Sequence, residues 1–242
     1  MSSQSRVVVI GGGIAGCSSA LALAGRGVSV TLLEASPRLG GRYCSVDIGG
    51  IERPIDGTQN VLFRNFERFL QLLATCEARG SVKLQNSTLL AFLEVKQRRI
   101  SKIQSGTLPP PNHLSASFLN ANFLGLSDKF SMQKAVQAMQ NLDEEQRREL
   151  DELSFLDWLE NNGQTKRAIS RFWNPISKLA LNVDCSQASA ASAIFLFKKA
   201  LIGNADALDV GCFTNDFTNA VSSSLRRLSL IHISEPTRHN AI

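Results

Sequence analysis

The apolar and polar positions near the start of the chain alternate between strand-like and helix-like patterns. Four consecutive β-formers occupy residues 7–10, an alanine- and leucine-rich stretch covers residues 17–26, and a second β run covers residues 28–33. Glycines separate the first run from the helix-like stretch. This order predicts strand, tight turn, helix and strand, which is the βαβ unit of an α/β fold.

The glycines between the first strand and the helix have the spacing G-x-G-x-x-G, at Gly11, Gly13 and Gly16. Such a turn predicts a dinucleotide site, because glycines permit the reversal, a close approach of the backbone to a pyrophosphate, and tight packing of helix on strand. Glu34 ends the second strand, where a carboxylate accepts a hydrogen bond from a ribose hydroxyl. The predicted cofactor-binding residues of this segment are Gly11, Gly13, Ile14, Ala15, Gly16, Glu34 and Ala35.

Apolar residues recur at helical spacing further along the chain. Phe66, Phe69 and Leu73 predict an amphipathic helix over residues 65–77. Further helices are expected over residues 131–141, 144–152, 154–161 and 164–182. Asp143 and Ser154 are suitable N-caps for two of them, and Gly163 predicts a break.

Between the first helices and the later ones the pattern returns to β. Three short runs, at residues 82–84, 89–95 and 99–103, predict a small sheet. We therefore expect a dinucleotide-binding domain over residues 1–80 and a second domain of small sheet and helices over residues 81–224.

Composition restricts the class of protein. The 242 residues carry a formal net charge of +5 with scattered basic residues, which does not indicate a nucleic-acid partner. Five cysteines without paired spacing favour a reducing, cytoplasmic compartment, and the three histidines are expected in loops and form no metal set. We expect no signal peptide and no membrane span, and the sequence has no G-x-S-x-G nucleophile turn.

The segment after Glu34 makes a family recognisable. Its R-x-G-G-R motif, residues 38–42, together with the glycine turn resembles the FAD-binding opening of the amine oxidase and phytoene desaturase superfamily. The resemblance implies FAD as cofactor and places Arg38, Gly40, Gly41 and Arg42 near the flavin and pyrophosphate. The alternative for the two arginines is an ordinary role in surface salt bridges.

Two later segments resemble the squalene-associated branch of this superfamily, the hydroxysqualene dehydroxylases. The spacing of residues 56–63 predicts a loop that returns to the cofactor. Asp56, Gly57 and Gln59 are similar to a segment of those enzymes, but Asn60 stands where they tend to have His. The resemblance implies cofactor contacts for Gly57, Thr58 and Gln59, and makes Gln59 and Asn60 candidates near the flavin. The other segment is F-W-x-P, in which Phe172 and Trp173 are expected either to line a polyisoprenoid cavity or to be plain core residues.

This resemblance implies an FAD-dependent oxidoreductase that removes the hydroxyl of hydroxysqualene to give squalene, with the flavin carrying the redox chemistry. The alternatives are a carotenoid desaturase of the same fold and a truncated remnant without activity. An amine oxidase is less favoured because Tyr43 is the only tyrosine, and an NAD-linked dehydrogenase leaves the Gly-Gly-Arg segment unexplained. A substrate this apolar resides in a bilayer, so we expect peripheral contact with the cytoplasmic membrane face; the sequence does not indicate the electron donor.

The last residues do not continue the preceding pattern. Residues 229–238 resemble a translated sequencing adapter, and we expect residues 225–242 to be a non-native tail on an N-terminal fragment. Relatives in the superfamily complete the FAD site with a C-terminal segment. The resemblance therefore implies that this part of the fold is missing and that the chain holds FAD weakly or not at all, whereas the parent protein holds it.

Overall fold

The structure is a computed structural model that describes residues 6–46, 49–50, 55–56, 62–87, 89–206, 209–213, 218–227 and 231–234. The chain divides into two compact units. Unit 1 comprises residues 1–62, 66–84 and 211–242, and unit 2 comprises residues 63–65 and 85–210. One boundary between the two units lies between residues 84 and 85. The domain limits expected from the sequence, at residues 80 and 224, stay a prediction.

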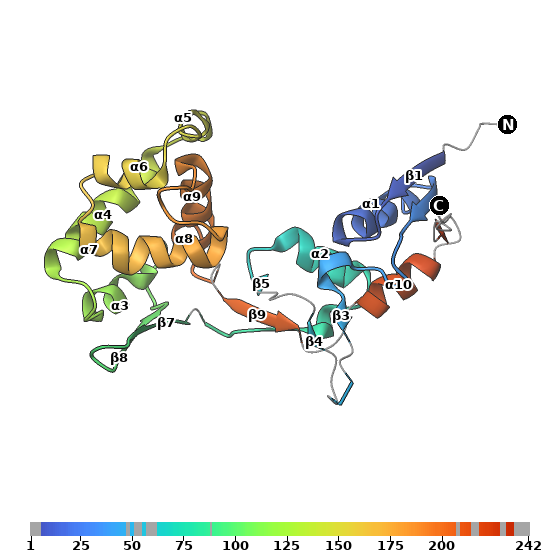
Figure 1. The fold of residues 1–242 in the computed structure, drawn as a ribbon, viewed down its shortest axis with the longest axis horizontal. Helices are drawn as coiled ribbons and strands as arrows, with labels where there is room; N and C mark the ends of the chain where they lie inside the picture. Colours follow the sequence, from blue (N-terminus) through green and yellow to red (C-terminus); the bar gives the residue numbers. More distant parts are fainter. Residues whose placement is uncertain are drawn as a thin grey trace, which may run out of the picture. The chain divides into compact units, whose positions relative to one another are not determined.

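Unit 1 begins with the predicted βαβ unit (Figure 1). Its three elements are β1 (Arg6–Ile10), α1 (Ile14–Ala24) and β2 (Ser29–Leu33). β1 and β2 pair in parallel with Val8 opposite Thr31, which confirms the expected strand, helix and strand. Residues of the C-terminal segment also form a strand, β10 (Ile231–Ser234), which pairs in parallel with β2. Whether residues 225–242 are native stays a prediction.

The remaining elements of unit 1 are short. They are η1 (Gly41–Tyr43), the antiparallel pair β3 (Ser45–Val46) and β4 (Ile55–Asp56), α2 (Glu67–Thr75), η2 (Arg79–Ser81), β6 (Val82–Leu84) and α10 (Thr218–Arg227). Two further strands, β5 (Leu62–Phe63) and β9 (Val210–Phe213), cross the boundary, because Phe63 and Val210 belong to unit 2. The helix predicted over residues 65–77 is confirmed as α2, whose Leu73 is fully buried. The core of the unit packs α1, α2 and α10 together through Cys17, Leu73 and Leu225.

Unit 2 is a β-hairpin followed by helices. Its elements are β7 (Leu89–Glu94), β8 (Arg99–Gln104), η3 (Asn112–Leu114), α3 (Ser115–Asn120), α4 (Leu126–Asn141), α5 (Glu144–Glu149), α6 (Phe155–Asn161), α7 (Lys166–Ala168), the π-helix η4 (Ile169–Trp173), α8 (Asn174–Leu181), α9 (Ala190–Phe197) and the π-helix η5 (Lys198–Ile202). Their apolar faces meet in one core that contains Phe155, Trp173 and Phe197.

Local signals in the sequence account for the limits of several of these helices. Asp143 accepts a hydrogen bond from the Gln146 amide at 2.8 Å, and the Ser154 hydroxyl accepts one from the Asp157 amide at 3.0 Å. Both predicted N-caps are therefore confirmed. The predicted break is confirmed too, because Gly163 has a φ of 70°.

Three expectations about this region need correction. The three β runs do not form one sheet: β6 pairs with β9, while β7 and β8 pair with each other. The helix expected over residues 164–182 begins at Lys166 and contains a π-helical turn. His113 is not an open loop residue, because it lies in η3 with its side chain buried.

Candidate functional site

The glycine turn of unit 1 joins the end of β1 to the start of α1. Gly11 has a φ of +97°, which favours glycine, and its amide donates to the Leu33 carbonyl at 2.7 Å. A Cβ at Gly16 would lie 1.9 Å from the Gly11 carbonyl oxygen. The tight reversal therefore requires glycine at position 11, and the close packing of helix on strand requires glycine at position 16, as the sequence pattern predicts.

Gly13 stands in a different environment. It is the N-cap of α1 with an ordinary extended conformation, and no side chain caps the helix. A Cβ added at Gly13 would meet no described atom within 4 Å. An uncapped helix start with open space in front of it is a suitable place for a phosphate group. The residues present thus fit the pyrophosphate of a dinucleotide cofactor.

Glu34 binds the glycine turn itself. One carboxylate oxygen accepts from the Gly12 amide at 2.6 Å and the other from the Ser36 amide at 2.7 Å. A side chain at Gly12 would collide with Leu39, at 2.4 Å, and with Glu34. A carboxylate has further acceptor positions, so the predicted ribose contact of Glu34 stays a prediction. Sequence reasoning missed the role of Gly12, although a third consecutive glycine was the available signal.

The R-x-G-G-R segment lies directly against the glycine turn. The Gly40 amide donates to the Gly12 carbonyl at 2.8 Å, and Gly40 forms a parallel bridge with Gly13. Gly41, with a φ of +58°, approaches so closely that a Cβ there would lie 3.2 Å from the Gly13 Cα. The structure therefore brings together the two motifs that the sequence analysis identified separately.

The remaining predicted cofactor residues fall into two groups. Ala35, Arg38 and Arg42 are exposed on the loop that carries Gly40 and Gly41. Gly57, Thr58, Gln59 and Asn60 lie outside the described residues. The contacts of both groups with a flavin stay predictions.

Unit 2 contains a cavity of about 560 Å³. Its volume falls within the range of roughly 300–1,000 Å³ that is usual for small-molecule sites. The apolar part of its lining includes Phe118, Met132, Val136, Phe172, Trp173 and Phe197. Both aromatic residues selected from the sequence thus line one largely apolar cavity.

Trp173 is at the same time a core residue. It is 1% exposed, and its ring centroid lies 4.9 Å from that of Phe197 and 5.1 Å from that of Phe172. Its indole nitrogen donates to Gln164 Oε1 at 2.9 Å, and Gln164 Nε2 donates to the Ser131 carbonyl. Both interpretations of Trp173 are therefore compatible with its position. Gln164, which fixes the indole, carried no recognisable signal in the sequence.

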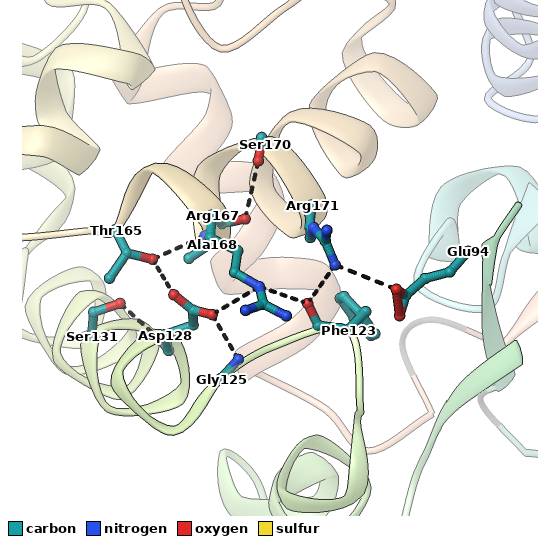
Figure 2. A network of polar contacts seen from close by, with 10 residues as sticks. All are labelled: Glu94, Phe123, Gly125, Asp128, Ser131, Thr165, Arg167, Ala168, Ser170 and Arg171. Carbon is teal, nitrogen blue, oxygen red and sulfur yellow. Dashed lines mark hydrogen bonds and ion pairs between the residues drawn. The ribbon is translucent and has the colours of Figure 1, made fainter. Parts of the chain in front are cut away.

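A polar network holds the helices beside this cavity together (Figure 2). The buried carboxylate of Asp128 accepts from the Gly125 amide and from the Thr165 hydroxyl, and lies 3.5 Å from the Arg167 guanidinium. Figure 2 shows Arg167 and Arg171 directed toward the carbonyl of Phe123. The network fixes the start of α4 against the helical segment that carries Phe172 and Trp173.

Two buried cysteine thiols, those of Cys17 and Cys185, are poor nucleophiles. Burial raises the pKa of Cys17 to about 11, and burial raises that of Cys185 to about 11 as well. Neither thiol is therefore ionised near neutral pH. Among the described residues no group of histidine, cysteine and acidic side chains could hold a metal ion. No helix within the described ranges is long and apolar enough to span a bilayer.

His113 is a buried group beside the cavity, next to Asn112 and Leu114 of its lining. Its Nδ1 has no hydrogen-bond partner among the described residues. Burial lowers the pKa of His113 below its ordinary value, because a desolvated imidazolium is disfavoured.

We expect this burial to make stability depend on pH. At pH values between the ordinary histidine pKa of about 6.5 and the lower pKa of folded His113, the unfolded chain binds more protons than the folded chain. The free energy of unfolding therefore falls as pH is lowered through that window. Urea unfolding at about pH 7.5, 6.5 and 5.5 measures the slope. His113→Leu and His113→Gln should both flatten it, and an unchanged slope in both variants would contradict the assignment to His113.

Comparison with known proteins gives the family context. A family model described as flavin containing amine oxidoreductase matches residues 14–207. Zeta-carotene desaturase from Zea mays is 29% identical over 202 residues, which cover 79% of this chain and 35% of that protein. The zeta-carotene desaturase of Synechocystis is 26% identical over 203 residues, covering 80% and 41%.

A solved structure supports the fold. The crystal structure of an oxidoreductase from Methanosarcina mazei superimposes with a TM-score of 0.66 at 17% identity, over 94% of this chain and 51% of that chain. This chain thus spans about half of the solved structure and a smaller share of the curated relatives, 35% and 41%.

These matches confirm two predictions, the flavin cofactor and the class of flavin-dependent oxidoreductase. The relatives are carotenoid desaturases, which supports the alternative reading of the sequence better than hydroxysqualene dehydroxylation.

Proposed function

Because the chain belongs to the flavin-containing amine oxidoreductase family, we propose that its protein is an FAD-dependent desaturase of an apolar polyisoprenoid, of the carotenoid type. The observation that carries the substrate class is the similarity to zeta-carotene desaturases over 79% of the chain. The cavity lined by Phe172 and Trp173 supports it, since an apolar chain needs apolar walls.

The proposed FAD site is built around the glycine turn. The uncapped start of α1 and the open space at Gly13 would receive the pyrophosphate, and Glu34 would accept from the ribose. The full proposed set is Gly11, Gly13, Ile14, Ala15, Gly16, Glu34, Ala35, Arg38, Gly40, Gly41, Arg42, Gly57, Thr58 and Gln59. The domain limits at residues 80 and 224 belong to the same proposal.

The protein's own contribution to the reaction is binding and exclusion of water. When bound, the flavin would supply the redox chemistry, taking up one hydride with its two electrons while a proton leaves the neighbouring carbon and the carbon–carbon double bond forms. The apolar walls of the cavity exclude water from the isoprenoid chain. Gln164 fixes the indole of Trp173 in that wall through a hydrogen bond of 2.9 Å.

The test uses the longest open reading frame that contains these 242 residues. The purified protein is incubated with phytoene or zeta-carotene, FAD and a quinone as electron acceptor, and the carotenoids are separated by chromatography with absorbance detection. We expect products with additional conjugated double bonds, which absorb at longer wavelength, above a control without protein.

Other results of this test would replace the proposal. Squalene formed from hydroxysqualene with chemically reduced FAD, without desaturation of either carotenoid, would establish the dehydroxylase instead. A purified protein without flavin absorbance and without either activity would identify an inactive remnant.

A further inference from the structure

The β7–β8 hairpin of unit 2 presents an apolar surface to solvent. Leu93 and Ile100 are cross-strand partners in the hairpin, and each is 64% exposed. Val95, just beyond the end of β7, is 76% exposed. Side chains alternate between the two faces of a strand, so Leu93 and Ile100 share the face opposite to that of Phe92 and Ser101. This face exposes three large apolar side chains close together.

The other face of the hairpin is firmly attached to the helices. The Phe92 ring stacks on Phe123 with centroids 4.6 Å apart and also contacts Phe172. Glu94 forms an ion pair with Arg171, which also donates to the Phe123 carbonyl (Figure 2). The exposed face therefore belongs to an ordered hairpin with a packed inner side.

Four cations accompany the exposed apolar residues. Lys96, Arg98, Arg99 and Lys102 are all exposed, and within the described part of the chain none of them forms an ion pair with a carboxylate. The only acidic residue of the segment, Glu94, is engaged by Arg171. The tip of the hairpin thus combines apolar side chains with an uncompensated positive charge.

An open apolar groove lies next to this face. It has a volume of about 610 Å³ and runs between the hairpin and α8. Its lining includes Leu93, Val95, Ile176 and Leu179, and Leu179 is itself 61% exposed. Apolar exposure therefore continues from the hairpin to the helix beside it.

We propose that the β7–β8 hairpin, with Leu179 of α8, docks unit 2 on an anionic lipid bilayer. The cations would meet lipid phosphates, while Leu93, Val95 and Ile100 would enter the boundary between headgroups and acyl chains. Charge complementarity favours this occupant, because four exposed cations without a paired carboxylate among the described residues match the negative surface of an anionic leaflet. The inference goes beyond the proposed function, because it concerns a surface that belongs to neither the cofactor site nor the cavity.

The test is sedimentation of the full chain with vesicles, without flavin or substrate, so that its outcome does not depend on catalysis. We expect binding to phosphatidylglycerol/phosphatidylcholine vesicles that weakens with added NaCl, and little binding to pure phosphatidylcholine. Lys96→Gln/Arg98→Gln should weaken binding about 25-fold, from roughly fivefold for each cation. Leu93→Ser/Ile100→Ser should weaken it on the order of tenfold.

Matched controls are Leu126→Ser and Lys134→Gln, which alter an exposed leucine and an exposed lysine of α4. Both should bind like the original chain. As a second measurement, tryptophan introduced by Val95→Trp should shift its emission to the blue on anionic vesicles and be quenched by brominated lipids.

Three results would overturn the proposal. The first is vesicle binding that both double variants leave unchanged. The second is equal, salt-independent binding to neutral vesicles. The third is a self-association of the chain that Leu93→Ser/Ile100→Ser abolishes, since the face would then join two copies.

Discussion

Gly13→Ala is expected to weaken FAD binding on the order of 100-fold while the chain stays folded. The backbone of Gly13 is in an extended conformation open to alanine, and no described atom lies within 4 Å of the added methyl group. The methyl would instead occupy the space through which a pyrophosphate approaches the start of α1. Quenching of flavin fluorescence on titration measures the affinity, and far-UV circular dichroism monitors the fold.

Gly16→Ala is expected to disturb the fold of the glycine turn as well as FAD binding. Its Cβ would lie 1.9 Å from the Gly11 carbonyl oxygen, so the turn itself must move. This variant should lose both thermal stability and FAD binding. Gly80→Ala is the control, because Gly80 has an unhindered position in η2 of the same unit. Equal flavin affinity in Gly13→Ala and Gly80→Ala would contradict the proposed pyrophosphate position.

Trp173→Ala should lower the free energy of unfolding by about 3–5 kcal/mol. The indole is 1% exposed and packs against Phe155, Phe172 and Phe197, so its removal leaves a void that rigid neighbours fill incompletely. Trp173→Phe should cost about 1–3 kcal/mol, because Gln164 Oε1 then loses its donor in a buried position. Urea unfolding followed by far-UV circular dichroism measures both variants.

The matched control is Phe130→Ala, which removes an aromatic ring that is 66% exposed. It should change stability by less than about 0.5 kcal/mol. A cost for Trp173→Ala as small as that of Phe130→Ala would show that Trp173 is not part of the packed core. The affinity of both Trp173 variants for a polyisoprenoid tests the role of the ring as a wall of the cavity. Unchanged affinity in Trp173→Phe together with lower affinity in Trp173→Ala would support that role.

Much of this structure could be predicted where the determining contacts are local. The strand, glycine turn and helix over residues 6–24 follow from β-formers, glycine spacing and helix formers in immediate succession. The caps at Asp143 and Ser154 bind amides three residues away, so the sequence displays both partners. These features do not depend on where the rest of the chain lies.

Contacts between distant residues could not be predicted in the same way. β6 pairs with β9, which lies further along the sequence, beyond residues 85–209, and a short β run does not identify its partner. The run over residues 7–10 likewise does not indicate which face is covered: Val9 packs in the core, whereas Val8 and Ile10 are exposed.

The candidate site shows the same limit. The sequence identified the glycine turn and the Gly40–Gly41 segment, but the contact between them depends on how the intervening loop folds. In that fold the side chain of Leu39 leaves no room for a side chain at Gly12. Gln164 was missed because a single glutamine between two helices has no distinctive pattern. Only the position of Trp173 in the folded chain shows that Gln164 accepts a hydrogen bond from its indole nitrogen.

The path of the chain through the two units has a consequence for biosynthesis. Gln85 and Val210, near the two ends of the long segment of unit 2, are joined by hydrogen bonds of 2.9 Å and 3.2 Å. This segment is therefore a closed insertion, complete as soon as residue 210 has left the ribosome. The first strands of unit 1 are made earlier but receive β9 and α10 only afterwards. The nascent chain must therefore carry an unfinished unit 1 while unit 2 folds.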